Sequence, residues 1–568
     1  MHNYEPQNFQ TYYCAVFVDS LVRHGLRHVV ISPGSRSTPL AIAFAAHPQV
    51  KKHIVIDERS AGFIALGIAQ YSGFPAALVC TSGTAVANYL PAVSESRMSG
   101  IPMIVLSADR DFDEHNTGAN QWIDQTNIFG NKAIFHANAN VDMNRLVTLD
   151  RLRLLADQTW LHAIDKKGCA HINFPFHKPL EPDTSFVESL TDLYNSPEFE
   201  LLSNQAVNSD YFELDRSLLN KLSEAKRPII VCGAGQQSNN LSSLIQQFTR
   251  LGIPVLYEAA STPILPHDSE FVYGANSYLR NEENCHVLRP DLIIRFGSEP
   301  IGKGILNYLK IHRDVDTIHF TDLVNWSNST FSNTTIFKCT SNSTCMNLPQ
   351  TTDGYVEWKH LLRKFSSDYL TSLSKIESVE SLRDGDVYIH LKEHISANDL
   401  VMISNSFSAR DLDLFGSPYL TKNQIYSNRG VSGIDGITST AIGIAKATDR
   451  RVTLIIGDLA WMHDMNAMIT MRNDDSIRVR VIVLNNNGGN IFRMLPISGS
   501  NYYQTYFETP QYLNISNITH SMGIESYSVR STKELSEALS TSESSRLVVI
   551  ECHTDAELSM GLRKLIWK

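Results

Sequence analysis

Residues 451–489 read RVTLIIGDLAWMHDMNAMITMRNDDSIRVRVIVLNNNGG, and this stretch decides the fold. Two short apolar runs rich in β-branched residues, Val452–Ile456 and Val479–Leu484, predict buried parallel strands. Between them, residues 461–471 place apolar side chains at helical spacing, which predicts a strand–helix–strand unit. The sequence therefore indicates an α/β fold built on parallel sheets.

Polar residues follow both predicted strands, GDL after the first and NNNGG after the second. Because the carboxyl ends of neighbouring parallel strands meet at one edge of a sheet, ligands bind there. A carboxylate from the first strand end, an amide oxygen from the asparagine run of the second and a backbone carbonyl are hard oxygen ligands that suit Mg²⁺. The backbone N–H groups of Leu459 and Ala460 would begin the next helix, where anions bind. An ordinary strand–helix–strand unit with polar loops is the alternative interpretation.

Length and composition narrow the class of protein. The chain has 568 residues, 43% of them hydrophobic and 19% charged, which is typical of a globular protein with about three or four domains. Its net charge of -10 argues against the basic face that nucleic acids require, so we expect no nucleic-acid partner. No apolar run reaches the ~20 residues of a membrane span, and we see no signal peptide. Eight scattered cysteines without a CxxC pair indicate a reduced, cytoplasmic protein.

The α/β pattern occurs in three successive stretches, which predicts three doubly wound parallel-sheet domains. We expect them at residues 1–185, 211–375 and 376–568, with an acidic, weakly periodic linker at 186–210. In the first domain a polar cluster follows each predicted strand, as expected along one ligand-binding edge.

The first and third domains contain matching segments. ALGIAQ at residues 65–70 matches AIGIAK at 441–446, and the strand ends 80–83 and 456–459 align at the same spacing. Two matches in one register predict that these domains are duplicated copies.

The GDL and NNNGG clusters resemble the motif of thiamine-diphosphate (ThDP) enzymes, GDG followed by NN one helix and one strand later. In that family the metal ligands are the Asp, the second Asn and the carbonyl two residues on, here Asp458, Asn486 and Gly488. The resemblance implies ThDP and Mg²⁺ as cofactors, with Mn²⁺ as a possible replacement, and makes the third domain the diphosphate-binding one. Leu459 departs from the general motif, which has glycine there.

Glu58 follows a predicted strand of the first domain. An acidic residue in that position is ordinarily a solvated loop residue or a helix N-cap. In ThDP enzymes, however, a carboxyl group of the N-terminal, pyrimidine-binding domain acts on the pyrimidine ring of the cofactor. That domain and the metal-binding domain belong to different subunits of a dimer. The resemblance therefore implies a homodimer, possibly paired into a tetramer, with Glu58 as its catalytic carboxyl group.

Longer motifs resemble one family in particular, the 2-succinyl-5-enolpyruvyl-6-hydroxy-3-cyclohexene-1-carboxylate (SEPHCHC) synthases of menaquinone biosynthesis. The motifs are SPGSRSTPL (32–40), DERSAGFIALGIA (57–69), TSGTAVANYLPAVSES (81–96), SADR (107–110) with GANQ (118–121), SNRGVSGIDG (427–436) and NNNGGNIF (485–492). The resemblance implies decarboxylation of 2-oxoglutarate and 1,4-addition of the succinyl carbanion equivalent to isochorismate, giving SEPHCHC and CO₂. Leu459 is the residue that this family has.

Each of these two substrates carries two carboxylates, so the site needs several cations, and arginine binds carboxylates through its planar fork. By resemblance, Arg410 and Arg429 lie near the succinyl group, and Asn405 and Ser406 beside them would also bind the cofactor. Those that would face isochorismate are Ser35, Arg36, Arg110, Gln121 and Lys303. Ile434 would support the bent form of ThDP; a core position is its alternative interpretation.

Two positions depart from the family pattern. Gly304 stands where relatives can have a basic residue, which puts a second cation there in doubt. Residues 111–115, DFDEH, replace the end of the usual DRPxEL, so the contribution of this segment stays open.

Two other functions remain open. The first is another ThDP-dependent 2-oxoacid decarboxylase or carboligase, such as an acetolactate synthase, which acts on smaller or less charged acceptors. The second, of a different class, is a degenerate ThDP-fold subunit with a regulatory or binding role. The combined presence of Glu58, Asp458 and Asn486 favours an active enzyme.

Overall fold

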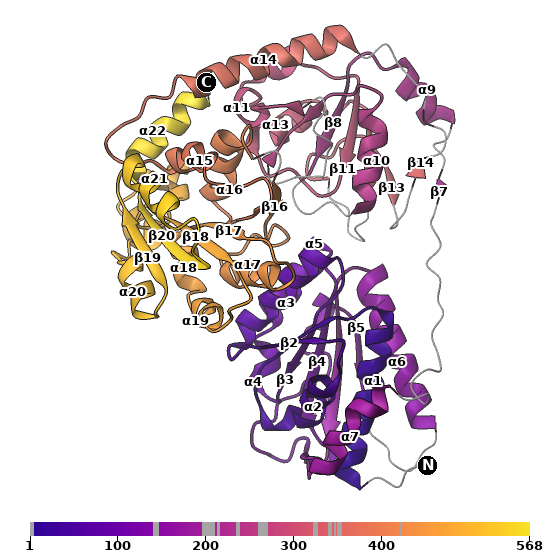
Figure 1. The fold of residues 1–568 in the computed structure, drawn as a ribbon. Helices are drawn as coiled ribbons and strands as arrows, with labels where there is room; N and C mark the ends of the chain where they lie inside the picture. The colour runs from indigo at the N-terminus through magenta and orange to yellow at the C-terminus, as the bar shows by residue number, and fades with distance from the viewer. Residues whose placement is uncertain are drawn as a thin grey trace. The chain divides into compact units, whose positions relative to one another are not determined.

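The computed structural model describes three six-stranded parallel sheets and one two-stranded sheet (Figure 1). The described residues are 5–139, 147–195, 211–212, 216–233, 239–259, 271–321, 328–338, 344–345, 348, 355–420 and 423–567. The chain divides into two compact units. The first comprises residues 1–206, 430–449 and 464–476, and the second comprises 207–429, 450–463 and 477–568. The predicted α/β fold with three parallel sheets is confirmed, and the predicted domain bounds stay a prediction.

The first unit contains the first sheet. In spatial order its strands are β2 (Lys51–Ile54), β1 (His28–Ile31), β3 (Ala77–Cys80), β4 (Met103–Arg110), β6 (Cys169–Phe176) and β5 (Ala133–Asn138). The helices of this unit are α1 (Pro6–His24), α2 (Thr38–Ala46), α3 (Glu58–Ser72), α4 (Thr84–Ala87), α5 (Leu90–Ser99), α6 (Val147–Asp165), α7 (Thr184–Tyr194), α17 (Ile437–Lys446) and α19 (Ala467–Arg472). Helices cover both faces of the sheet, so β3 and β6 are buried throughout.

The second unit contains the other two large sheets. The middle one runs β10 (Phe271–Val272), β9 (Val255–Leu256), β8 (Pro228–Cys232), β11 (Leu292–Phe296), β12 (Thr317–Thr321) and β13 (Thr334–Lys338). The third runs β16 (Gln424–Tyr426), β15 (Leu400–Ile403), β17 (Val452–Gly457), β18 (Val479–Asn485), β20 (Leu547–His553) and β19 (Glu525–Val529). The two-stranded sheet pairs β14 (Thr344–Cys345) with β7 (Tyr211–Phe212).

The helices of the second unit fall into two groups, one for each of its large sheets. Around the middle sheet they are α9 (Arg216–Glu224), α10 (Asn239–Thr249), α11 (Ala275–Tyr278), α12 (Glu282–Val287), α13 (Lys303–Ile311) and α14 (Val356–Ser374). Those in the sequence of the third sheet are α15 (Asp384–Leu391), α16 (Phe407–Asp411), α18 (Asp458–His463), α20 (Ile515–Ser521), α21 (Thr532–Thr541) and α22 (Ala556–Ile566). No helix among the described residues is long and apolar enough to cross a membrane.

The strand orders support the predicted duplication. Numbered along the chain, the strands of the first and third sheets follow the same spatial order, 2-1-3-4-6-5. The middle sheet instead has the order 3-2-1-4-5-6 of a doubly wound fold.

The matched segments of the duplicated domains form helices α3 and α17, which pack on one another in the first unit. Their contact passes through glycines at equivalent positions of the repeat. A Cβ atom on Gly67 would lie 2.1 Å from the carbonyl oxygen of Thr440, and one on Gly443 would lie 2.1 Å from that of Ile64. The repeated glycine therefore allows two helix backbones to touch.

Helix α7 occupies the beginning of the stretch that the sequence predicts as a linker. Phe186, Leu190 and Tyr194 recur at helical spacing and are buried, and the Tyr194 hydroxyl donates to the carbonyl oxygen of Ala43 at 2.8 Å. Residues 186–194 of the predicted linker are therefore helical, and these three side chains complete the core of the first unit, while the bounds of the linker stay a prediction. The rest of that stretch, residues 196–210, lies outside the described residues.

Candidate active site

Strands β17 and β18 bring the predicted metal loop together in the second unit. Their register pairs Gly457 with Leu484, so the residues that follow the two strands start side by side. Asp458 is 6% exposed, and its Oδ2 accepts a hydrogen bond from the backbone N–H of Gly488 at 2.7 Å. Its Oδ1 accepts one from the N–H of Leu459 at 2.8 Å.

The surroundings of Asp458 fit a divalent cation. Burial raises the pKa of its carboxyl group to about 6, hydrogen bonds from backbone N–H groups oppose this rise, and the charge of Asp384 adds to it. Within the described ranges no lysine, arginine or histidine forms an ion pair with Asp458. This buried carboxylate is an oxygen donor of the kind that Mg²⁺ prefers. The other two predicted ligands, the Oδ1 of Asn486 and the carbonyl oxygen of Gly488, accept hydrogen bonds from Asn490 in this structure.

The loop after β18 is held by its own side chains. The Nδ2 of Asn490 donates to the backbone oxygen of Asn486 at 2.8 Å and to its Oδ1 at 2.9 Å. Gly488 has a φ of +133°, and a Cβ atom there would lie 2.2 Å from the carbonyl oxygen of Glu508. This position therefore requires glycine, whose N–H contacts Asp458 while its carbonyl oxygen accepts a hydrogen bond from the N–H of Asn490 at 2.9 Å.

The predicted diphosphate donors differ from the expectation. The N–H of Leu459 is used by Asp458, and Ala460 is buried in a helix of six residues. The assignment of these two N–H groups to an anion stays a prediction.

The four residues predicted beside the succinyl group form one connected set. Arg429 donates from Nη1 to Oδ1 of Asn405 at 2.7 Å, and the Nδ2 of Asn405 donates to the carbonyl oxygen of Asn428 at 3.0 Å. Ser406 has a φ of +67° and begins α16, where Arg410 donates from Nη1 to its carbonyl oxygen at 2.7 Å. Burial lowers the pKa of Arg410, and the negative charge of Glu258 opposes that change.

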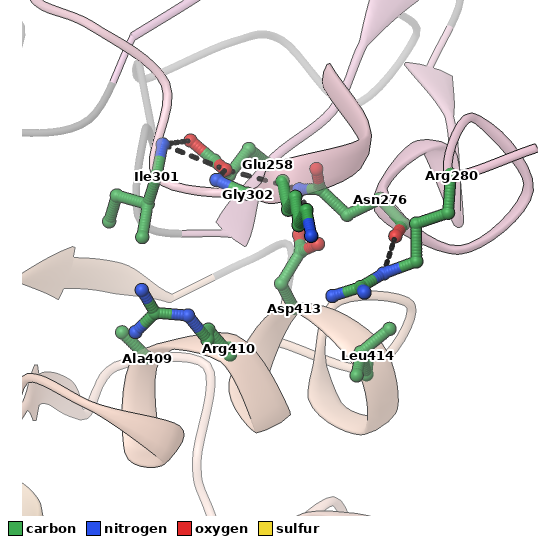
Figure 2. A pocket seen from close by; sticks show the side chains of 10 residues that line it. Glu258, Asn276, Arg280, Ile301, Gly302, Ala409, Arg410, Asp413 and Leu414 are labelled. Carbon is green, nitrogen blue, oxygen red and sulfur yellow. Dashed lines mark hydrogen bonds between the residues drawn. The ribbon is translucent and has the colours of Figure 1, made fainter. Parts of the chain in front are cut away.

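Three cations line one pocket of the second unit: Arg280, Lys303 and Arg410 (Figure 2). Arg280 donates from Nε to the carbonyl oxygen of Asn276 at 3.2 Å, and its guanidinium carbon lies 4.1 Å from the ring centroid of Trp567. Burial lowers the pKa of Arg280, and the charge of Arg410 lowers it further. None of these cations has an ion-pair partner in the described part of the chain, so the pocket suits an anion.

Two buried carboxyl groups, those of Glu258 and Asp413, also line this pocket (Figure 2). Glu258 accepts hydrogen bonds from the backbone N–H groups of Ile301 at 2.9 Å and Gly302 at 2.6 Å. The Nδ2 of Asn276 donates to Glu258 at 3.1 Å and to Asp413 at 2.8 Å. Burial raises the pKa of both carboxyl groups, and the charge of Glu258 raises that of Asp413 further. These bonds fix the turn that precedes α13.

Contacts of Gly304 with residues 275 and 276 explain why this position has no basic residue. A Cβ atom there would lie 2.7 Å from the Cα of Asn276 and 2.9 Å from the carbonyl oxygen of Ala275. No basic side chain fits at this position, and Arg280 instead adds a cation beside Lys303. Sequence reasoning missed Arg280 because it lies in no recognisable motif.

In the first unit, Glu58 is the first residue of α3 and is half-buried. The helix cap is its neighbour Asp57, which accepts hydrogen bonds from the N–H groups of Arg59 at 2.9 Å and Ser60 at 3.4 Å. The ordinary role of an acidic residue at this point is thus filled by Asp57. Glu58 is therefore not the residue that caps α3.

The first unit also places four of the five residues predicted to face isochorismate near the carboxyl ends of its strands, whereas the fifth, Lys303, lies in the second unit. Arg36, 6% exposed, and Arg110, at the end of β4, share the carboxylate of Glu114. Gln121 donates from Nε2 to the carbonyl oxygen of Ser82 at 3.0 Å. Ser35 is exposed on the turn that contains Arg36.

Ile434 lies on a loop of the first unit and is 43% exposed, so it is not the core residue of the alternative interpretation. Glu95, which is 1% exposed, holds the beginning of this loop. Its carboxylate accepts hydrogen bonds from the N–H groups of Gly430 at 2.7 Å and Val431 at 2.8 Å. Glu95 is a second residue that sequence reasoning missed.

Two family models match the parts of the chain that contain Glu58 and the metal loop. Residues 13–128, which include Glu58, match the N-terminal TPP binding domain of thiamine pyrophosphate enzymes. Residues 416–552, which include Asp458 and Asn486, match the C-terminal TPP binding domain of the same enzymes. Thiamine pyrophosphate is another name for ThDP.

Full-length relatives carry the name 2-succinyl-5-enolpyruvyl-6-hydroxy-3-cyclohexene-1-carboxylate synthase. The protein from Bacillus cytotoxicus is 31% identical, over 98% of this chain and 96% of its own length. Those from Gloeothece citriformis and Haloarcula marismortui are each 33% identical, over 97% and 98% of this chain and 97% of their own lengths. The chain therefore belongs to the family of thiamine-diphosphate-dependent enzymes.

Proposed function

We propose that this protein is a SEPHCHC synthase. It would decarboxylate 2-oxoglutarate and add the remaining succinyl unit to isochorismate in a 1,4 manner, releasing SEPHCHC and CO₂ for menaquinone biosynthesis. The names of its full-length relatives support this proposal.

The observation that carries the proposal is the set of cations in the pocket of the second unit. Arg280, Lys303 and Arg410 line one small pocket without an ion-pair partner among the described residues. Arg280 and Arg410 are partly buried and Lys303 is exposed, and together these cations favour an anionic ligand, because guanidinium groups suit carboxylates. The dicarboxylates 2-oxoglutarate, at Arg410, and isochorismate, at Lys303, meet this demand better than the smaller or less charged substrates of an acetolactate synthase.

The cofactors would be held by residues of both units. Asp458, Asn486 and the carbonyl group of Gly488 would bind Mg²⁺, or Mn²⁺ in its place. Glu58 would hold the pyrimidine ring of ThDP through its carboxyl group, and Ile434 would support the ring from its anchored loop. When bound, ThDP stabilises the negative charge that develops as a 2-oxoacid loses CO₂.

The substrates would be oriented by the cations. Arg410 and Arg429, with Asn405 and Ser406, would bind the carboxylates of 2-oxoglutarate. A second group would bind isochorismate: Ser35, Arg36, Arg110, Gln121 and Lys303. Their task is to fix charge and geometry, because guanidinium groups stay protonated throughout turnover. We also propose a homodimer in which one protomer supplies Glu58 and its partner supplies the metal loop.

A CO₂-release assay tests the proposal. The protein is titrated with ThDP and Mg²⁺ and then given 2-oxoglutarate with and without isochorismate. We expect ThDP binding that depends on Mg²⁺ and CO₂ release that rises when isochorismate is present. Turnover of pyruvate in place of 2-oxoglutarate would favour an acetolactate-type enzyme, and cofactor binding without any turnover would favour a regulatory subunit.

The variant Glu58→Gln is the matched control of this assay. It keeps the size of the side chain and removes the acid, so we expect ThDP binding to persist and turnover to be lost. Near-normal activity of this variant would contradict the role proposed for Glu58.

A further inference from the structure

The carboxylate of Glu114 joins two arginines in the first unit. Its Oε1 accepts a hydrogen bond from Nη1 of Arg110 at 2.7 Å, and its Oε2 lies 3.6 Å from Nη2 of Arg36. Glu114 ends a single turn of 3₁₀ helix, Phe112–Glu114, that comes directly after β4. One carboxylate thus uses both of its oxygens to bridge two guanidinium groups.

The two arginines do not depend on Glu114 for their positions. Arg36 donates from Nη1 to the carbonyl oxygen of Phe176 at 3.0 Å, and Arg110 donates from Nε to that of Asn120 at 2.6 Å. The side chains of Arg36 and Arg110 are 6% and 14% exposed, whereas that of Glu114 is 38% exposed. Glu114 is therefore the partner that can leave to solvent while both cations stay in place.

The neighbouring acids have other partners. Asp109 accepts hydrogen bonds from Asn173 at 2.9 Å and from the N–H of Arg110 at 2.7 Å. Asp111 pairs with His177 at 2.7 Å. Among the described residues, Glu114 alone forms an ion pair with both arginines. Burial lowers the pKa of Arg36, the charge of Arg110 lowers it further, and Glu114 and its acidic neighbours oppose this.

We propose that Glu114 occupies an anion site between Arg36 and Arg110, and that a carboxylate ligand binds there by displacing it. Binding then exchanges one carboxylate for another, so Glu114 weakens the affinity for every competing anion. Glu114 is therefore a specificity-determining residue. A ligand whose carboxylate is its only contact with the protein gains little by replacing the carboxylate of Glu114, so such ligands bind weakly. This inference rests on the proposed function only where it identifies the natural ligand, a ring carboxylate of the isochorismate type.

The test compares Glu114→Gln with a control in the same turn, Asp113→Asn. Asp113 is exposed, and its substitution removes the same unit of charge without touching the bridge. Benzoate is titrated into the full-length protein without ThDP, and binding is followed by calorimetry. We expect Glu114→Gln to bind benzoate about tenfold more tightly than the unmodified protein, and Asp113→Asn to bind it unchanged. Thermal unfolding confirms that both variants are folded.

A double-mutant cycle locates the effect. In the background of Arg36→Gln, the substitution Glu114→Gln should no longer strengthen benzoate binding, because the site has lost one of its two cations. In turnover assays, Glu114→Gln should lower KM for isochorismate and leave kcat within about twofold.

The opposite results overturn the inference. Equal or weaker benzoate binding by Glu114→Gln would show that the carboxylate orients the arginines, and an equal gain in Asp113→Asn would show a general charge effect. Because benzoate binding needs neither cofactor nor isochorismate, it separates the two proposals. Tighter binding in a protein that does not use isochorismate would contradict the proposed function and support the anion site.

Discussion

The guanidinium group of Arg563 donates to the carboxylate of Asp384 at 2.5 Å, and both side chains are 1% exposed. Arg563 also pairs with Asp411, which follows Arg410 at the end of α16. Asp384 in turn accepts a hydrogen bond from Nδ2 of Asn486 at 3.3 Å. One arginine of the last helix thus connects the predicted metal loop to the predicted substrate helix.

The first prediction concerns this link. Arg563→Ala leaves two buried carboxylates without their cation, so we expect a loss of about 3–5 kcal/mol in the free energy of unfolding. Chemical denaturation measures it. Lys564→Ala, an exposed change on the same helix, is the control and should have little effect. Similar losses in both variants would indicate that the helix as a whole, and not the buried pair, is sensitive.

A second prediction follows from the crossing of α3 and α17. Gly67→Ala or Gly443→Ala forces a methyl group against a backbone carbonyl, so we expect destabilisation of about 1–3 kcal/mol or more, measured by thermal unfolding. Gly561, in α22, has no atom within 4 Å of its added Cβ. Gly561→Ala should therefore stabilise the protein slightly, because alanine favours helix. Unchanged stability in Gly67→Ala would contradict the observed packing.

The pocket of the second unit supports a third prediction. Arg280→Gln removes one of its three cations, so KM for 2-oxoglutarate should rise about tenfold. Arg280→Lys should recover part of the affinity because it restores the charge but not the fork. The control is Arg289→Gln, since Arg289 is half-exposed and pairs with Asp314 at the surface. A changed kcat with an unchanged KM would place Arg280 outside the substrate site.

Much of the fold and part of the site could be predicted from the sequence, and the limits have physical reasons. The strand–helix–strand pattern around Asp458 is local, so hydrophobic periodicity and the polar strand ends were sufficient to predict the parallel sheet and its loops. Arg280 and Glu114 were not predicted, because their roles depend on partners that only the tertiary fold brings near. Helix α7 was missed because three apolar residues in an acidic stretch give a weak helical signal.

The last prediction concerns acid stability. His28 and His53 stack in the first unit, with Nδ1 of His28 lying 3.1 Å from Nε2 of His53. Burial lowers the pKa of His28 to about 4 and that of His53 to about 3; Lys51 and Lys446 lower the pKa of His53 further, and Asp474 opposes them.

A depressed pKa means that the folded protein binds protons less well than the unfolded chain. The stability contributed by this pair is therefore fully present above the unfolded value of about 6.5 and is lost as pH falls toward 4 and below. His53→Gln removes one titrating group, so its free energy of unfolding should fall less steeply between pH 6.5 and 4 than that of the unmodified protein. The exposed His520 is the control, since His520→Gln should leave the slope unchanged. Denaturant titrations across this pH range measure both slopes, and parallel curves for His53→Gln and the unmodified protein would contradict the assignment.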